Sequence, residues 1–393
     1  MSNVTETVPG PAGPQGTTGG GNAVVGYLSG IRDVVVLEMK QRLRSRGWYI
    51  MLGIWFVVIA VVTWLTWAAW SASAGIQRSM PSSGMSMQSG PGSAIFEAVL
   101  VFVLLFALLV APALSANAVN GDRAGGTLAI LQVTLLTPGQ ILWGKFLAAW
   151  LAALAFLVTS IPFLVFGLVQ GGLSPGHILV SLLMLGVEIA IVCGIGVGIS
   201  ALAGRPLFSI VVSYLTVAGL VVLSLIAFGL GMQLTQESVM VDEPGPSMAY
   251  IPPSASGGPQ SIPCRPVQQT VFHTERVALV LAINPFVVVA DAIPYPERDS
   301  ANSMLGAGML EGISQGTRQA LAGPRLPFSP CVDGVYQPQN QQLQNQYQYL
   351  QQTTPVWPLG LSMQLVLAGL LMWLGWRALR TPANRLARGT RIA

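Results

Sequence analysis

Six stretches of the chain are each apolar over a length that can cross a lipid bilayer. A hydrocarbon core about 30 Å thick takes about 20 helical residues, and a helix satisfies its own backbone groups in lipid. Only 9% of the 393 residues are charged, too few to cover a water-soluble surface. The sequence therefore predicts an all-α polytopic membrane protein with six transmembrane helices. The stretches are Trp48–Trp70, Ile95–Leu114, Ile141–Val169, Ile178–Leu202, Leu207–Met232 and Leu359–Trp376.

The segments outside these stretches divide the chain further. The N-terminus is rich in Pro and Gly and is expected to be disordered. Leu28–Arg46 has an apolar face with basic flanks, which predicts an amphipathic helix in the headgroup layer; a short soluble helix is the alternative. The predicted regions are 1–27 (disordered cytoplasmic N-terminus), 28–232 (interfacial helix and spans one to five), 233–356 (large insertion), 357–377 (span six) and 378–393 (basic tail).

The placement of lysine and arginine predicts the orientation. The segment before the first span and the tail after the last each hold five basic residues, and the insertion holds five arginines against nine acids. Cytoplasmic flanks carry the excess of Lys and Arg. We therefore expect both termini in the cytoplasm, the chain in the cell membrane and the insertion outside. Within the insertion, Val277–Ile293 is apolar but broken by Asn284-Pro285, which favours a re-entrant or interfacial helix over a seventh span.

Two of the three cysteines, Cys264 and Cys331, lie in the insertion. An extracytoplasmic compartment is oxidising, so a disulfide between them is predicted. Two free thiols that never meet are the alternative.

The stretch from Gly139 to Phe146 approaches the phosphate-binding pattern G-x-x-x-x-G-K-[ST]. Phe146 stands where the Mg²⁺ ligand Ser or Thr belongs, and Ile141 already begins a membrane helix rather than a loop. Lys145 is expected to run its stem along lipid and to place its amine in the headgroups. The chain has two histidines and no metal-ligand motif. We expect no catalytic residues, no metal, no nucleic-acid partner and no nucleotide bound by this chain.

Glu188 is the one acid deep inside a predicted span. Intramembrane carboxylates are costly and indicate function by default. Glu188 is therefore a candidate for the translocation path or for proton handling, and a hydrogen bond to a neighbouring helix is the alternative.

The longest predicted cytoplasmic loop between spans, Gly121–Lys145, is not a plain linker. The charged pair Asp122-Arg123 precedes a glycine break, and Leu128–Leu136 has the composition of about two turns of apolar helix, ended at Thr137-Pro138. A short apolar helix at this face either lies in the headgroups or fills a groove on another protein.

This loop resembles that of ABC-type export permeases of the type-2 class. Such permeases carry, after their second span, a Glu-Arg-rich run, Gly-Thr-Leu, an apolar helix, Thr-Pro and Gly-Lys. Here Asp122 replaces Glu, Ala124-Gly125 replace a second Glu-Arg pair, and the 124-residue insertion is longer than expected. The matching residues, in order, are Asp122, Arg123, Gly126, Thr127, Leu128, Thr137, Pro138, Gly144 and Lys145.

The resemblance implies a permease subunit whose loop helix, with Leu131 on it, contacts a separate ABC ATPase subunit. ATP and Mg²⁺ would then be bound by two ATPases, which rock two six-span halves in the bilayer, either a homodimer or a heterodimer. The rivals are an ion-coupled secondary transporter using Glu188 and a non-transporting membrane scaffold or sensor. Lipid, antibiotic, glycan and peptide substrates all stay open.

Overall fold

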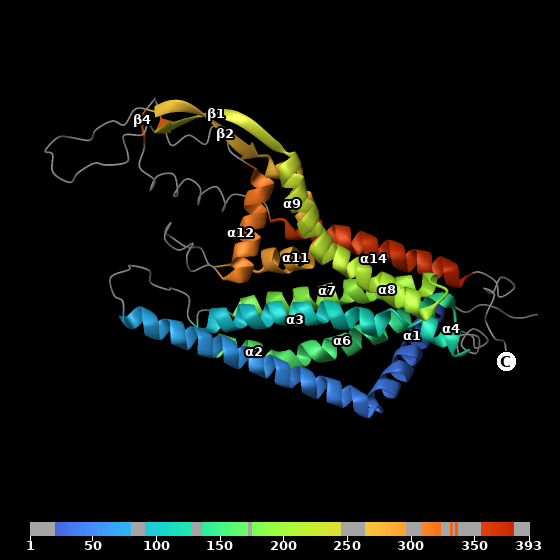
Figure 1. Cartoon of the computed structure of the whole chain (residues 1–393). Coiled ribbons are helices and arrows are strands. Elements are labelled where there is room, and N and C mark those ends of the chain that lie inside the picture. The colour runs from blue at the N-terminus through green and yellow to red at the C-terminus, as the bar shows by residue number, and fades with distance from the viewer. Residues whose placement is uncertain are drawn as a thin grey trace, which may run out of the picture.

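The six predicted spans are confirmed. The computed structural model describes residues 20–79, 91–126, 136–171, 175–244, 264–295, 308–323, 331–332, 335–336 and 355–380. Six of its helical segments are long and apolar enough to cross a membrane (Figure 1). They are α2 (Arg46–Ser79), α3 (Pro91–Ser115) continued by α4 (Asn120–Ala124), α6 (Pro138–Val169), α7 (Pro175–Leu202), α8 (Pro206–Ala218) joined to α9 (Ser224–Leu234) by the π-helical turn η2 (Gly219–Leu223), and α14 (Trp357–Leu379).

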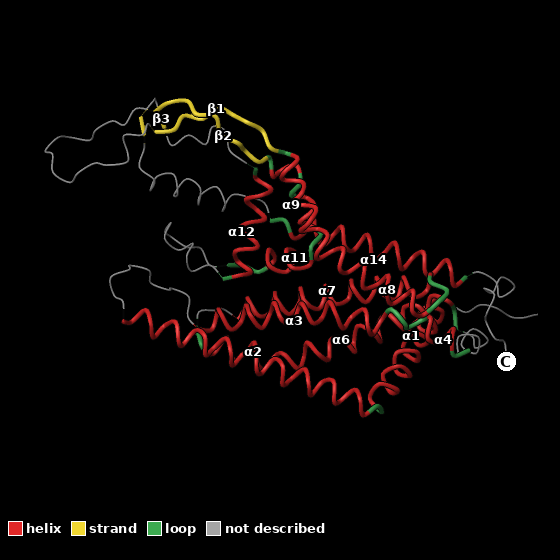
Figure 2. Tube along the Cα trace, viewed as in Figure 1, coloured by secondary structure: helices red, strands yellow, loops and turns green. Residues whose placement is uncertain are grey.

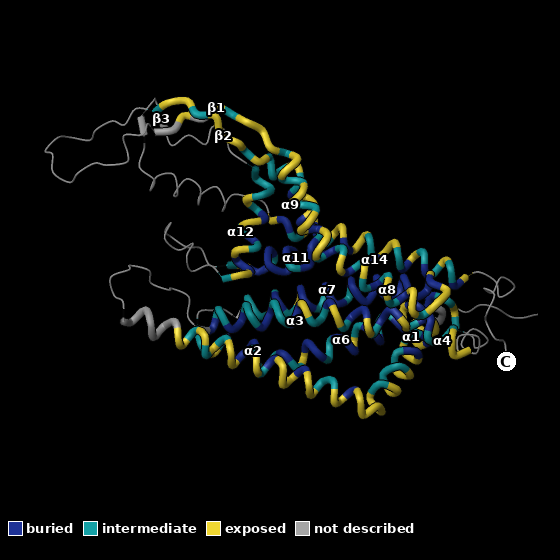
Figure 3. The backbone as a smooth tube through the Cα atoms, in the orientation of Figure 1, coloured by how far each residue is buried: buried dark blue, intermediate teal, exposed yellow. Residues whose placement is uncertain are grey.

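Helix α7 forms the centre of the bundle. It packs against α3, α6 and α14, whereas α2 lies at the edge with much of its surface exposed (Figure 3). In lipid, such contacts depend on close van der Waals packing and on small residues. A Cβ atom at Gly198 of α7 would lie 2.7 Å from the carbonyl carbon of Leu371 in α14. Glycine at this position therefore lets the two backbones approach.

The predicted amphipathic helix is present as α1 (Gly20–Leu43), and it begins earlier than expected. The disorder predicted for residues 1–27 does not extend to 20–27, which are helical, and residues 1–19 lie outside the described part. The reason is a tertiary contact, because α6 binds the backbone of Gly26 and Tyr27. α1 packs along the start of α6 and buries Val34, while Leu37 and Leu43 stay exposed.

The chain between α9 and α14 combines short helices with a small antiparallel ladder (Figure 2). β1 (Gln236–Pro244) pairs with β2 (Cys264–Phe272), with Gln236 opposite Phe272 and Pro244 opposite Cys264. β3 (Cys331–Val332) pairs with β4 (Val335–Tyr336). This insertion leaves the bundle at the ends of α9 and α14 that lie away from α1 and α4 (Figure 1).

The apolar segment Val277–Ile293 is broken at Asn284, as predicted. The 3-10 turn η4 (Thr274–Arg276) and α10 (Leu279–Ala282) precede the break, and α11 (Pro285–Ala292) follows it. The Asn284 carboxamide accepts a hydrogen bond from the Phe286 N–H at 2.9 Å and so caps α11. It also donates to Ser224 Oγ at 2.9 Å, next to the π turn. With eight residues, α11 is too short to span a membrane.

Asp291 of α11 joins the insertion to the last span. Its carboxylate accepts hydrogen bonds from Ser314 Oγ at 2.8 Å and from Arg318 Nε at 2.5 Å, both on α12 (Met309–Ala322). It also accepts from the backbone N–H groups of Val356 and Trp357, at 2.5 and 2.9 Å. A helix start leaves such N–H groups without partners and favours a negative charge. One buried carboxylate therefore holds α11, α12 and the beginning of α14 together.

Candidate functional site

Helix α6 begins at a capping box. Thr137 Oγ1 accepts the Gln140 N–H at 3.4 Å, and Gln140 Oε1 accepts the Thr137 N–H at 2.7 Å. Pro138 occupies the first turn, where no N–H is required. The Thr137-Pro138 pair, expected to end the preceding helix, thus starts α6. The stretch from Gly139 to Phe146 is helix, and this excludes the loop geometry that the phosphate-binding pattern needs.

Helix α1 packs against this same part of α6. Gln140 Nε2 donates to the carbonyl oxygens of Gly26 and Tyr27, at 3.3 and 3.1 Å. A Cβ atom at Gly144 would lie 2.6 Å from Val34 Cβ. Helix α1 therefore crosses α6 so closely at this point that only glycine fits at position 144.

Lys145 lies at the centre of a charged group buried between helices. Its side chain is 2% exposed, and Nζ lies 2.7 Å from Glu38 Oε1 of α1 and 2.5 Å from Asp122 Oδ2 of α4. The expectation that Lys145 extends along lipid to the headgroups is wrong. Two carboxylates offer its ammonium group counter-charges inside the protein, and a buried charge requires such partners. We refer to Lys145, Glu38 and Asp122 as the ionic triad.

Arg123, which follows Asp122 in the sequence, connects α4 to a different helix. Its guanidinium donates to the carbonyl oxygens of Ala203 and Ala201, at 2.8 and 3.4 Å, at the end of α7. A cation at a helix C-terminus satisfies carbonyls that have no helical partner. Ser200 Oγ adds an acceptor for the Val119 N–H at 3.1 Å. The charged pair Asp122-Arg123 therefore connects α4 to α6 on one side and to α7 on the other.

Arg42 brings α3 into this arrangement. Its Nη2 donates to the Leu114 carbonyl oxygen at 3.3 Å. Burial lowers the pKa of the Arg42 guanidinium below its ordinary value, and the Glu38 carboxylate opposes that shift. We call the meeting point of α1, α3, α4, α6 and α7, with the ionic triad at its centre, the junction.

The structure brings six of the predicted loop residues to the junction. Gly126 follows α4 with φ +73°, a conformation that suits glycine, and Thr127, Leu128 and Leu131 lie outside the described residues. Sequence reasoning missed Glu38 and Gln140. The available signals were a lysine near the start of an apolar helix, which needs an acid, and a glutamine three residues after a threonine. The six are Asp122, Arg123, Thr137, Pro138, Gly144 and Lys145.

Glu188 lies away from the junction, inside α7. It is 1% exposed and sits beside the Gln364 carboxamide of α14, without a well-formed hydrogen bond to any described residue. Gln364 itself donates from Nε2 to the Ile283 carbonyl oxygen at 3.0 Å. The structure thus places Glu188 between helices rather than against lipid.

The two cysteines of the insertion begin two of its strands, Cys264 in β2 and Cys331 in β3. β1, which pairs with β2, also contacts β3. The side chain of Cys331 is outside what the structure describes, so their bond stays a prediction.

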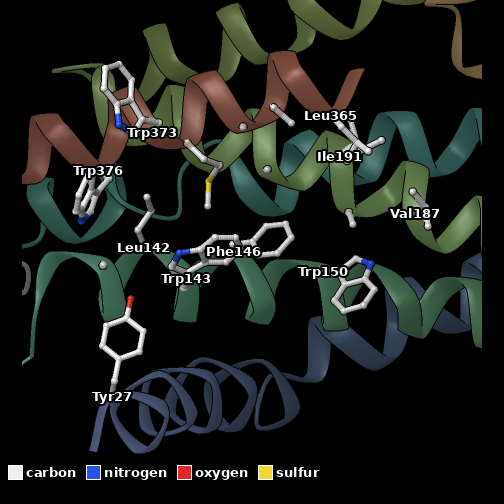
Figure 4. Close-up of a pocket in the computed structure, with 16 residues that line it drawn as sticks. Tyr27, Leu142, Trp143, Phe146, Trp150, Val187, Ile191, Leu365, Trp373 and Trp376 are labelled. Atoms are coloured by element: carbon white, nitrogen blue, oxygen red, sulfur yellow. The ribbon is translucent and has the colours of Figure 1, made fainter. Parts of the chain in front are cut away.

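An apolar groove runs between α6, α7 and α14, with Tyr27 of α1 at one end (Figure 4). Its volume is about 690 Å³, and none of the residues that line it is charged. Trp143 meets Phe146 edge to face, with ring centroids 5.5 Å apart, and Phe146 stacks with Trp150 at 6.5 Å. Trp143 and Trp373 are 47% and 46% exposed, so the groove opens to the outside of the bundle.

Most of the chain matches a known protein family. The model of a family described as "ABC-2 family transporter protein" matches residues 33–374. A search of curated proteins finds no match. Over the described ranges, no three His, Cys, Asp or Glu side chains gather as a metal site requires.

Proposed function

Because the chain belongs to the ABC-2 family of transporter proteins, we propose that it is the membrane-spanning permease of an ATP-driven exporter. Separate ATPase subunits would bind and hydrolyse ATP with Mg²⁺, and the permease would convert their movement into passage of substrate. The permease would work in the cell membrane as a homodimer or with a sister subunit. The basic segments at both ends support cytoplasmic termini.

The junction is the observation that carries this proposal. Segment 127–135 connects α4 to α6 in the sequence, and the described residues on either side of it contact several helices through charges or caps. On one side Asp122 binds Lys145 at 2.5 Å and Arg123 binds the end of α7. On the other side Thr137 and Gln140 cap α6 and hold α1. A push by an ATPase on this segment would therefore reach α1, α6 and α7 together.

Leu131→Glu tests the docking of an ATPase to this segment. We expect the substitution to abolish co-purification of the ATPase, because it places a charge in an apolar contact. Membrane insertion should be unchanged, because Leu131 lies in the sequence between the span that ends at Ala124 and the span that begins at Pro138. Leu131→Met is the matched control and should keep the partner, since it preserves apolar volume. Unchanged co-purification of Leu131→Glu would reject Leu131 as a docking residue.

A second function is favoured by one observation, the buried carboxyl group of Glu188 without a well-formed hydrogen bond to a described residue. An ion-coupled transporter would use such a group to carry a proton across the bundle. It predicts transport that follows a proton or sodium gradient and needs no ATPase. Transport by purified permease vesicles that lack any ATPase would favour this function over the first.

We also propose that Cys264 and Cys331 form a disulfide in an oxidising compartment. The contact of β1 with both β2 and β3 supports this pairing. Peptide mapping by mass spectrometry without reduction should recover the two cysteine peptides as one linked species. Alkylation of both thiols in the native, unreduced protein would exclude the bond.

A further inference from the structure

We infer that the groove between α6, α7 and α14 is a binding site for one acyl chain of an acidic phospholipid, whose headgroup lies at Arg377 and Arg380. This site is distinct from the junction. We place this site in the cytoplasmic leaflet, and that placement rests on the orientation given under the proposed function. The binding of the lipid itself does not depend on that function.

The length of the groove fits one leaflet. Along α14 its lining runs from Trp376 to Leu365, and along α6 from Gly139 to Trp150. Eleven residues of α-helix rise about 16 Å, close to half of a hydrocarbon core of about 30 Å. At the end of the groove near the bilayer midplane, Trp150 Nε1 donates to the Gly186 carbonyl oxygen at 2.9 Å. This hydrogen bond fixes the Trp150 ring across α6 and α7. The groove thus ends where the tail of a single-leaflet lipid ends.

The walls of the groove are suited to an acyl chain. Aromatic rings line both sides, from α6 and from α14 (Figure 4), and Gly194 of α7 also lines the groove. Tyr27 lies at the opposite end of the groove, at the membrane surface, where its hydroxyl oxygen faces Gly139. Tryptophan and tyrosine at such a level are typical of the membrane interface, where one end of the ring is apolar and the other is wet.

Two cations lie at that same end. The Arg380 guanidinium sits 3.5 Å from the ring centroid of Trp376, and the Arg377 guanidinium sits 4.9 Å from that of Trp373. Both tryptophans line the groove, and both arginines are exposed. The ring contacts hold the positive charges beside the mouth of the groove. An uncharged groove with cations fixed at its mouth complements a phospholipid, because the apolar tail fits the groove and the anionic headgroup meets the cations.

Gly369 provides a substitution that fills the groove without disturbing the fold. It lines the groove, and a Cβ atom there would meet nothing within 4 Å. Gly369→Leu should therefore occupy the space of the acyl chain while improving helix propensity. Gly229 of α9 is the matched control, because it is also an exposed helical glycine with nothing within 4 Å, and it is not part of the groove.

The experiment is native mass spectrometry of the purified permease from mixed micelles with equal amounts of dioleoyl phosphatidylglycerol and dioleoyl phosphatidylcholine. We expect one retained lipid per chain, with phosphatidylglycerol preferred roughly tenfold or more, since each arginine near an anionic head adds about a fivefold preference. Gly369→Leu should lose the lipid, and Gly229→Leu should keep it. Arg377→Gln combined with Arg380→Gln should keep a lipid without preference.

Several results would overturn the inference. They are equal retention of the two lipids by the native chain, full retention by Gly369→Leu, or the same loss in Gly229→Leu. A disulfide between two chains carrying Gly369→Cys would place a second copy of the permease over the groove and would also overturn it. The assay uses the permease alone, so a failure to find an ATPase partner leaves its result unaffected.

Discussion

Replacing Lys145 by methionine should destabilise the permease and disconnect the junction. The substitution removes the cation that Glu38 and Asp122 share, and the side chains of these two acids are 22% and 26% exposed. Breaking a buried ion pair costs about 3–5 kcal/mol, and partial exposure of the carboxylates reduces this to about 2–3 kcal/mol. Thermal unfolding in detergent should show a midpoint lower by on the order of 5 °C. ATP-dependent transport should be lost with it.

Two comparison variants separate charge from packing in this experiment. Lys40→Met removes an exposed lysine of α1 and should leave the midpoint unchanged. Combining Lys145→Met with Glu38→Gln and Asp122→Asn also removes the two carboxylates that lost this shared counter-charge, so stability should recover. If Lys145→Met unfolds at the same temperature as Lys40→Met, the ionic triad contributes nothing to the fold.

Replacing Asp291 by alanine should have an equal or larger effect on stability. The Asp291 side chain is 0% exposed, and its loss leaves Arg318 without its counter-charge and two backbone N–H groups of α14 without an acceptor. Removing one partner of such a buried pair costs about 3–5 kcal/mol. The unfolding midpoint in detergent should fall by roughly 5–10 °C. Hydrogen exchange should increase at Val356 and Trp357, because their amides lose their acceptor.

Graded variants test whether this effect comes from Asp291 as a hub. Ser314→Ala removes one hydrogen bond to the carboxylate and should cost about 1 kcal/mol. Asp33→Ala, at an exposed acid of α1, should be neutral. A midpoint for Asp291→Ala equal to that of Ser314→Ala would contradict the role of Asp291 in binding α11 to α14.

Much of the fold could be predicted because the bilayer imposes a length on apolar helices. The stretch Ile141–Val169 was predicted from its composition alone, and α6 differs from it only by its capped start at Pro138. The break at Asn284 could be predicted from the sequence because an Asn-Pro pair caps a new helix. Local chemistry decided both cases.

The contacts that cross between helices could not be predicted in the same way. Asp122, Arg123 and Lys145 were selected through a family resemblance, but their partners depend on how distant helices meet. Glu38 lies 107 residues before Lys145, and nothing local to either residue identifies the other. The order of residues 20–27 likewise depends on Gln140, which is over 110 residues away. Tertiary contacts also turned Lys145 inward, whereas its sequence context favoured the lipid headgroups.

The groove between α6, α7 and α14 could not be predicted from the sequence either. Trp143 lies near the start of one predicted span, and Trp373 and Trp376 lie near the end of another. Only the packing of α14 against α6 and α7 brings them into one apolar surface with Tyr27. A gap at Gly369 depends on the crossing of three helices, and no local pattern encodes it.

The most direct test of the central claim is purification of the tagged permease from its native membranes in mild detergent, with every stoichiometric partner identified by mass spectrometry. Our account predicts an ATPase subunit that carries a complete G-x-x-x-x-G-K-[ST] loop and that is lost from the Leu131→Glu variant. If the permease is recovered folded under several mild conditions and no ATPase accompanies it, segment 127–135 is not a docking site for an ATPase, and the account is contradicted.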